Sequence, residues 1–256
     1  MILMTLNLRF QNEHDGQNGW ENRKDLILEL VRVHKPAFLG TQEGTVTQLR
    51  FLQEHLSGYE LFAPERLWED DCQYCSIFMR SEAVRALEGG EFWLSETPAV
   101  HRSIGWDSAF PRMMSHGLFT DLESARTILL AVTHLDNIGV EARKQQARII
   151  RDWLALHNGP RVLMGDFNDR PGSAAHQLLT SPESGLFDTW QVLRRPEDES
   201  SMTYHKFLGV PMVCRMDWIL ASGEFRVEDA RVVYDHSEEG RYPSDHFPYM
   251  VRLAWA

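Results

Sequence analysis

Cysteine is scarce in this chain, which has only Cys72, Cys75 and Cys214 among its 256 residues. Three cysteines are too few for a disulfide framework and are typical of a protein from a reducing compartment. The N-terminal residues also lack a basic segment, a long apolar run and a small-residue cleavage site, so we expect no secretory signal there. The simplest interpretation is a cytoplasmic protein.

Long hydrophobic runs, internal repeats and low-complexity linkers are absent as well. No stretch reaches the roughly 18–20 uninterrupted apolar residues that a membrane span needs. The polar residues 194–201 are predicted to form an exposed loop and not a domain boundary. At 256 residues and 43% apolar composition the chain can bury one large core, which predicts one domain over residues 1–256.

Basic residues are outnumbered, with 26 Lys and Arg against 37 Asp and Glu and a formal net charge of −11. The net electric field of such a protein repels polyanions, which disfavours non-specific binding to duplex DNA. A local basic face or a bound metal ion could still attract nucleic acid, so the charge limits this class of partner without excluding it.

The hydrophobic pattern alternates between short strands and amphipathic helices. Helical spacing relates Leu26, Leu30 and Val33, and later Ala147 and Ile150. These segments lie between β-rich apolar runs, which predicts an α/β protein with helices packed outside sheets. The runs predicted as strands are residues 2–8, 37–40, 76–79, 118–122, 127–133, 161–164, 216–220, 227–233 and 248–253.

Polar residues follow several of these strands directly. In the segment Gly-Asp-Phe-Asn at residues 165–168, Asp166 and Asn168 are two residues apart and can face the same cleft. The carboxylate can accept a proton or bind metal, while the amide can donate to a phosphoryl oxygen. A simple turn is the alternative, because Gly, Asp and Asn form turns and Pro171-Gly172 follows.

A second group lies toward the C-terminus. Ser244-Asp245-His246 precedes the last predicted strand, and Asp217 stands at the mouth of an apolar strand. A carboxylate in that position needs a partner, and a histidine N–H is a natural one. The alternative for Ser244-Asp245 is a local cap or Asx turn.

Asn7, Glu43 and His134 each close a further predicted strand. Each could instead have a purely structural role: Asn7 as a strand-end amide, Glu43 as a helix-capping acid and His134 as a partly buried histidine. All of these polar groups, however, lie at strand ends, where layered α/β folds assemble their sites. Local capping alone does not account for that joint pattern.

Taken in order, these residues resemble those of the endonuclease/exonuclease/phosphatase superfamily, which includes DNase I-like nucleases, inositol polyphosphate 5-phosphatases and neutral sphingomyelinases. Gly-Asp-Phe-Asn and Ser-Asp-His are the most specific matches, and Arg-Met-Asp-Trp-Ile-Leu at residues 215–220 is similar to the family's Arg-Ile-Asp-Tyr-Ile-Leu. The segments 92–98 and 203–205 are similar to bacterial members of the family. Leu6 is a departure, because many members carry Trp or Tyr before the amide at Asn7.

The resemblance implies a four-layer α/β sandwich, with two facing, mixed and mostly antiparallel sheets flanked by helices. It also implies a divalent metal ion, Mg²⁺ or Mn²⁺, bound mainly by Glu43 and assisted by Asn7 and Asp245 directly or through water. Such hard oxygen ligands suit these ions.

The same resemblance implies catalytic roles for five side chains. Asp166 and Asn168 would position the attacking water and a phosphoryl oxygen. His246, oriented by Asp217, would act as a base or as a charged phosphate ligand. His134 would stabilise developing charge or protonate the leaving oxygen, although the sequence does not indicate a carboxylate partner for it.

Further residues are candidates for substrate binding. Arg112 could add a cation near the phosphate, or form only a surface salt bridge. Trp93 and Trp106, flanked by polar loop residues, could form a substrate wall, whereas most of the eight tryptophans are expected in the core. Tyr74 could contact substrate, or simply begin a strand.

Several alternatives remain open at this level. Cys72-x-x-Cys75 could bind zinc, but the chain shows no recognised spacing of two further ligands. A non-catalytic scaffold with this fold would have no physical need for the complete set of acids and imidazoles. The acidic charge favours a phosphorylated small molecule or single-stranded nucleic acid over duplex DNA, within a hydrolase that could also be a nuclease. A monomer is the family-like expectation.

Overall fold

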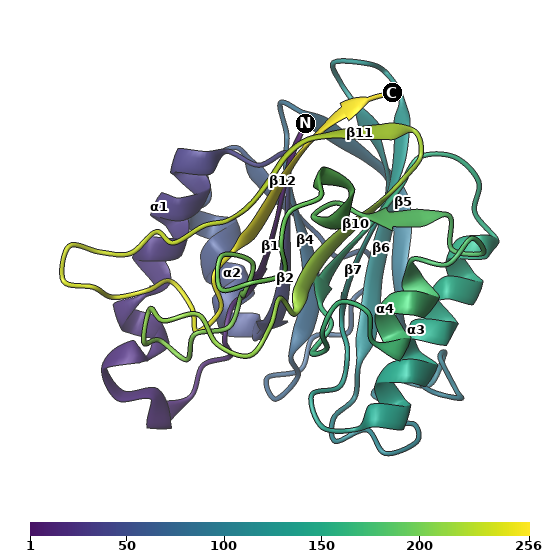
Figure 1. Cartoon of the computed structure of the whole chain (residues 1–256). Helices are drawn as coiled ribbons and strands as arrows, with labels where there is room; N and C mark the ends of the chain where they lie inside the picture. Colours follow the sequence, from purple (N-terminus) through teal and green to yellow (C-terminus); the bar gives the residue numbers. More distant parts are fainter.

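Two six-stranded sheets lie face to face at the centre of the protein, and the computed structural model describes residues 1–256 (Figure 1). The first sheet has the order β11 (Phe225–Val232), β12 (Tyr249–Trp255), β1 (Ile2–Asn7), β2 (Phe38–Gly44), β4 (Tyr74–Arg80) and β3 (Tyr59–Phe62). The second has the order β5 (Val84–Trp93), β6 (Met113–Asp121), β7 (Thr127–His134), β8 (Arg161–Asp166), β10 (Asp217–Ser222) and β9 (Leu186–Asp188). Only β1 with β2 and β7 with β8 run parallel.

Helices cover the outer face of each sheet (Figure 1). The first sheet carries α1 (Lys24–His34) and α2 (Val46–His55), and the second carries α3 (Val140–Ala155) and α4 (Ala174–Leu179). Three short 3₁₀ helices complete the fold, namely η1 (Glu13–Asn18), η2 (Trp20–Asn22) and η3 (Gln191–Leu193). The structure thus confirms the predicted four-layer sandwich of two mixed, mostly antiparallel sheets.

The helices form where the sequence supplies an apolar stripe. Buried Ile27 and Leu30 of α1 belong to the larger of two hydrophobic clusters, whereas Ile150 and Leu154 of α3 belong to a separate cluster beneath α3 and α4. α2 is not among the elements predicted from the sequence. It begins with a capping box at Thr45, and its apolar stripe is too short to stand out from its polar residues.

β5 also escapes prediction, because its two central glycines resemble a turn. In the structure these glycines lie in an edge strand that residues of neighbouring strands approach closely. A Cβ atom on Gly89 would lie 2.3 Å from the His116 carbonyl oxygen and 2.6 Å from the Phe62 ring. Glycine is therefore required by close approach and not by a turn.

Gly165 is the glycine whose replacement should perturb the fold most. Its φ is +154°, and an added Cβ would lie 2.0 Å from the Thr133 carbonyl oxygen on the parallel neighbour β7. Gly165→Ala should lower the free energy of unfolding by about 2–4 kcal/mol, because backbone must move in two central strands. Urea denaturation measures this change. Gly223→Ala is the control, since nothing lies within 4 Å of its added Cβ, and an equal effect of both substitutions would contradict the prediction.

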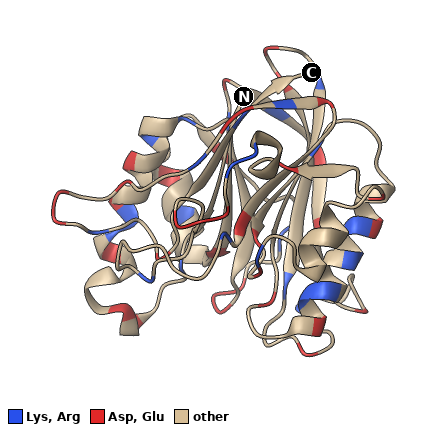
Figure 2. Ribbon diagram, in the orientation of Figure 1, with Lys and Arg blue, Asp and Glu red and all other residues tan.

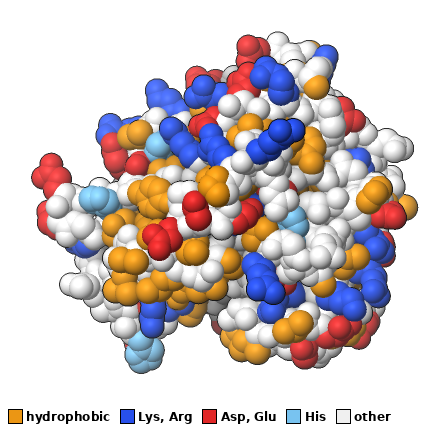
Figure 3. Space-filling model, viewed as in Figure 1, with side chains coloured by type: hydrophobic (Ala, Val, Ile, Leu, Met, Phe, Trp, Pro, Cys, Tyr) orange, Lys and Arg blue, Asp and Glu red, His pale blue; other side chains and the backbone are white.

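None of the helices combines the length and the apolar composition that a membrane crossing requires. Acidic and basic positions are mixed along the outer helices (Figure 2). On the face drawn in Figure 3, the Lys and Arg side chains lie in separate groups among acidic and hydrophobic ones. This face offers no continuous basic track for a nucleic-acid backbone.

Candidate active site

The strand ends predicted to carry polar groups converge at one end of the two sheets. Asn7 closes β1 and Glu43 lies near the end of β2, which runs parallel to β1. In the second sheet, His134 at the end of β7 and Asp217 at the start of β10 are both register partners of Asp166. The topology therefore gathers residues that are far apart in the sequence.

Asn7 connects the two sheets at this point. Its amide Nδ2 donates to Glu43 Oε1 at 3.0 Å and to Asp166 Oδ2 at 3.0 Å. The Ser244 hydroxyl donates to the Asn7 carbonyl oxygen at 2.5 Å. This bond ties the turn that carries Asp245 to the end of β1. The Asn7 side chain thus links two acidic side chains, and its backbone carbonyl holds the turn that carries a third.

Glu43 is held in an uncommon backbone conformation. Its φ is +60°, at a point where the pairing between β2 and β4 shifts register. Its second carboxylate oxygen, Oε2, accepts the Phe10 backbone N–H at 3.1 Å. Positive φ at a non-glycine residue costs free energy and clusters at functional sites. Asn168, with φ of +49°, shares this property.

A buried imidazole lies between two buried carboxylates. His246 Nδ1 is 2.9 Å from Asp217 Oδ2, and His246 Nε2 is 3.7 Å from Asp166 Oδ2. Burial acts to lower the pKa of His246, but the charges of Asp217 and Asp166 outweigh it and raise the pKa. Burial and the repulsion of Asp217 raise the pKa of Asp166. The two carboxylates therefore favour the protonated ring, whose Nε2 faces Asp166.

His134 has a different electrostatic environment. Arg112 Nη1 lies 3.0 Å from His134 Nδ1, and both side chains are buried. A guanidinium can only donate, so Nδ1 accepts and the ring proton resides on Nε2. Burial, followed by the Arg112 charge, lowers the pKa of His134 well below its ordinary value. His134 Nε2–H therefore faces an acceptor in the Asp166 carboxylate, whose Oδ2 is 3.5 Å away.

Arg23 is a site residue that the sequence patterns do not reveal. Its buried guanidinium donates to the backbone carbonyls of Leu8 and Arg9 at the end of β1, and to Pro243 just before the Ser-Asp-His turn. Burial lowers its pKa to about 10. An isolated arginine at a helix start has no sequence signal that marks it as a support of this kind.

Comparison with known proteins identifies the family of this chain. The model of the endonuclease/exonuclease/phosphatase family matches residues 4–246. The chain belongs to this family. Among solved structures it resembles the mannosyl-6-phosphatase Bt3783 of Bacteroides thetaiotaomicron, with 29% identity, all of both chains covered and a TM-score of 0.88. A functionally unknown protein of Enterococcus faecalis is 28% identical over all of both chains, with a TM-score of 0.88.

More distant structures share only the fold. The Danio rerio TDP2 complexed with a single-strand DNA product is 18% identical, with 99% of this chain and 98% of that chain covered and a TM-score of 0.78. The family is one of phosphoesterases, and this chain has the corresponding fold. Its members generally use divalent metal ions.

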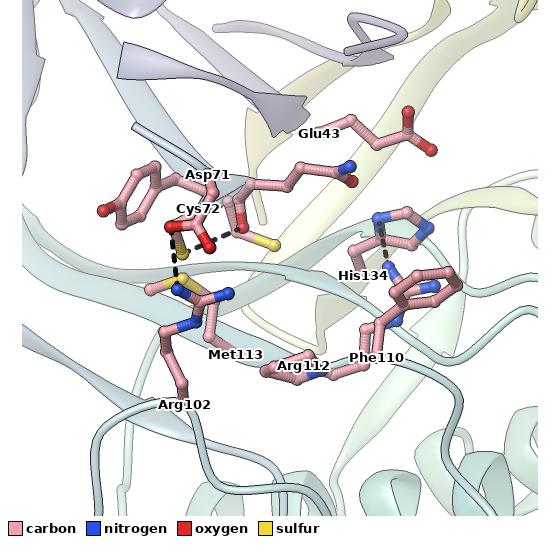
Figure 4. A pocket seen from close by; sticks show the side chains of 12 residues that line it. Glu43, Asp71, Cys72, Arg102, Phe110, Arg112, Met113 and His134 are labelled. Carbon is pink, nitrogen blue, oxygen red and sulfur yellow. Dashed lines mark hydrogen bonds and ion pairs between the residues drawn. The ribbon is translucent and has the colours of Figure 1, made fainter. Parts of the chain in front are cut away.

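A hollow of about 80 Å³ adjoins this cluster of polar side chains (Figure 4). Glu43, His134 and Arg112 line one part of it, and Tyr74 lines another. The Tyr74 side chain is buried, and its hydroxyl donates to the Leu67 carbonyl while accepting the Glu69 N–H, so it shapes the loop before β4.

The two candidate tryptophans lie outside this hollow. Trp93 is buried at the end of β5, with its ring edge-on to His101. Trp106 has a positive φ in the loop between β5 and β6 and does not line the hollow. The structure thus brings Arg112 and Tyr74 to the cleft but not Trp93 or Trp106.

The cysteines do not join a group of metal-ligating side chains. Cys72 and Cys75 are both buried, and burial raises the pKa of each thiol. Neutral thiols are poor metal ligands. The side chains whose ligand atoms cluster within 4.8 Å are Asp166, Asp217 and His246. That group could hold a metal ion, but His246 would have to lose the proton that Asp217 stabilises.

The chemistry of the site nevertheless fits a divalent cation near Glu43. Burial, together with the charge of Glu43, raises the pKa of Asp245, so these two carboxylates repel one another. A concentration of negative charge on hard oxygen atoms is the environment that Mg²⁺ and Mn²⁺ stabilise.

Proposed function

We propose that this protein is a Mg²⁺- or Mn²⁺-dependent phosphatase that hydrolyses phosphomonoesters of small molecules. The observation that carries the proposal is the Asn7 amide, which binds Glu43 and Asp166 at once. It places the carboxylate suited to a metal beside the carboxylate suited to a base. A non-catalytic scaffold protein would have no physical need for this arrangement of carboxylates.

Glu43, Asn7 and Asp245 would hold the metal ion. When bound, the ion would cancel charge on the phosphoryl oxygens and stabilise the departing alkoxide. The chain itself keeps these groups in place: Arg23 fixes the backbone on both sides of the site, and Ser244 joins the Asp245 turn to β1.

The remaining side chains would align water and phosphate. Asp166 orients the attacking water and accepts its proton. His246 donates Nε2–H to a phosphoryl oxygen, and Asp217 keeps it charged. Asn168 and neutral His134 add N–H donors, which stabilise the charge that builds up on the phosphoryl oxygens in the transition state.

Two observations support a small phosphomonoester as the substrate. The net charge of −11 opposes polyanions. The mannosyl-6-phosphatase that resembles this chain over its whole length acts, as named, on a sugar phosphate. A phosphodiesterase or single-strand nuclease is the second candidate, because the same residues would serve a diester.

Model substrates test the proposal. The protein should release p-nitrophenol from p-nitrophenyl phosphate only with Mg²⁺ or Mn²⁺ present, and should lose this activity in EDTA. Its kcat/KM for p-nitrophenyl phosphate should exceed that for bis-p-nitrophenyl phosphate by about tenfold or more, because the diester lacks the second ionised oxygen that the cationic donors bind. Preference for the diester would favour the nuclease candidate. Absence of metal-dependent release from both substrates would favour a scaffold.

A further inference from the structure

The hollow beside the catalytic cluster has a far wall that the proposed chemistry does not use. Glu43 and His134 lie at one side of it, and Asp71 and Arg102 lie at the other (Figure 4). The far wall comes from the loop between β3 and β4 and the loop between β5 and β6. A phosphate bound at the cluster would direct its alcohol substituent into this hollow.

An ionic cluster holds the two loops together along the far wall of the hollow. Arg102 Nη1 donates to Asp71 Oδ1 at 2.8 Å and to Glu69 Oε2 at 2.9 Å. His101 lies 3.3 Å from the other oxygen of Glu69. The Asp71 side chain is 76% exposed and that of Arg102 is 32% exposed. Ion pairs this exposed contribute little to stability, so folding alone does not account for the cluster.

We propose that Arg102, Asp71 and Gln73 form a binding site for the hydroxyl groups of a neutral polyol, the sugar part of a sugar phosphate. A carboxylate accepts hydrogen bonds from hydroxyl groups, a guanidinium donates to them, and an amide does both. Because Glu69 fixes the guanidinium, little side-chain entropy is lost when a sugar binds. This inference rests on the proposed phosphatase function and specifies its substrate class.

The charges on the walls are balanced. Two carboxylates, of Glu43 and Asp71, and two guanidinium groups, of Arg102 and Arg112, line the hollow, so it presents no excess of positive charge that would attract a second phosphate. Phe110 lines the same hollow and is 50% exposed, which leaves an aromatic ring available to the apolar face of a sugar.

Steady-state kinetics with two substrates test this site. Mannose 6-phosphate and glucose 6-phosphate carry hydroxyl groups, whereas p-nitrophenyl phosphate does not. We expect Arg102→Gln and Asp71→Asn to lower kcat/KM for the sugar phosphates by about tenfold or more relative to p-nitrophenyl phosphate, chiefly through KM, because each removes a charge-assisted hydrogen bond. Arg226→Gln is the matched control, since it breaks an exposed pair with Glu228 on β11, and it should leave the ratio unchanged.

The possible outcomes distinguish failure of the sugar-binding site from failure of the proposed phosphatase function. If the parent protein hydrolyses both kinds of substrate and neither variant changes the ratio, the hollow does not bind sugar hydroxyls and this proposal is wrong. Faster hydrolysis of oligonucleotides than of sugar phosphates, lowered by the same variants, would also overturn it. If the parent hydrolyses none of the substrates with Mg²⁺ or Mn²⁺, the proposed function itself fails. Asp71 is largely exposed, so loss of folding would not explain the effect of its variant.

Discussion

Replacement of Asp166 by Asn should lower kcat for p-nitrophenyl phosphate by roughly 10²- to 10⁴-fold, which is the usual contribution of a general base. The side chain is buried, and its raised pKa gives it a greater affinity for a proton than an exposed carboxylate has. An amide occupies the same volume and can still accept the Asn168 backbone N–H, which now lies 2.9 Å from Oδ1. It cannot take a proton from water. Measurements of kcat and KM at saturating Mg²⁺ give the result directly.

Asp229→Asn is a matched control for this experiment. Asp229 pairs with Arg195 at 2.8 Å on the surface strand β11, where its side chain is 39% exposed. The same chemical change there should leave turnover within about twofold of the parent. Undiminished turnover in Asp166→Asn, or an equal loss in both variants, would refute the role assigned to Asp166.

Replacement of Asp188 by Asn should cost the largest amount of stability, about 3–5 kcal/mol at neutral pH. Asp188 Oδ2 lies 2.7 Å from Arg215 Nη2 and 2.8 Å from His176 Nε2, and the charged side chains are almost completely buried. Without the carboxylate, Arg215 would remain a buried cation paired only with Glu197. Guanidinium denaturation measures the loss. Asp229→Asn, which breaks an exposed pair, should cost less than about 1 kcal/mol.

The Asp188 carboxylate also makes the free energy of unfolding depend on pH. Burial acts to raise the pKa of Asp188, but the hydrogen bond from His176 and the charge of Arg215 outweigh it and lower the pKa from 3.8 to about 2. A lowered pKa in the folded state means that the stabilisation is present above pH 3.8 and is lost as the pH falls toward 2. The lowered pKa of Asp188 therefore contributes about 2 kcal/mol to the free energy of unfolding. The stability difference between the parent and Asp188→Asn should therefore shrink over this range, and a constant difference would contradict the assignment.

Most of the fold follows from local patterns in the sequence. The predicted strand at residues 161–164 is part of β8, and that at residues 127–133 is part of β7. Their continuous apolar character reflects burial on both faces of a central sheet. β5 and β9 were not predicted from the sequence. β5 is an edge strand with exposed residues and two glycines, and β9 has only three residues. These two edge strands carry too little apolar signal to be identified locally, whereas the edge strand β11 alternates regularly and was predicted as residues 227–233.

The sequence by itself determined which residues stand at strand ends, because the alternation of side chains and the length of an apolar run are local properties. On that basis Asn7, Glu43 and Asp166 could be predicted to meet. Only the tertiary structure decided how they meet. The Asn7 bond to Asp166 joins residues 159 positions apart, and the bond from Ser244 to Asn7 joins residues 237 positions apart. Such contacts depend on strand register and on the packing of the two sheets.

The environment of His134 likewise shows which properties the sequence determined and which the tertiary structure decided. The sequence placed it at a strand end but not beside Arg112, whose charge adds to the effect of burial in lowering the pKa of the imidazole. The wall formed by Arg102 and Asp71 is likewise invisible in the sequence, because two loops 31 residues apart must close on one another before it exists. Charge and hydrogen bonding act over a few ångströms in space, so the chemistry of each group was decided by its neighbours in the fold and not by its neighbours in the chain.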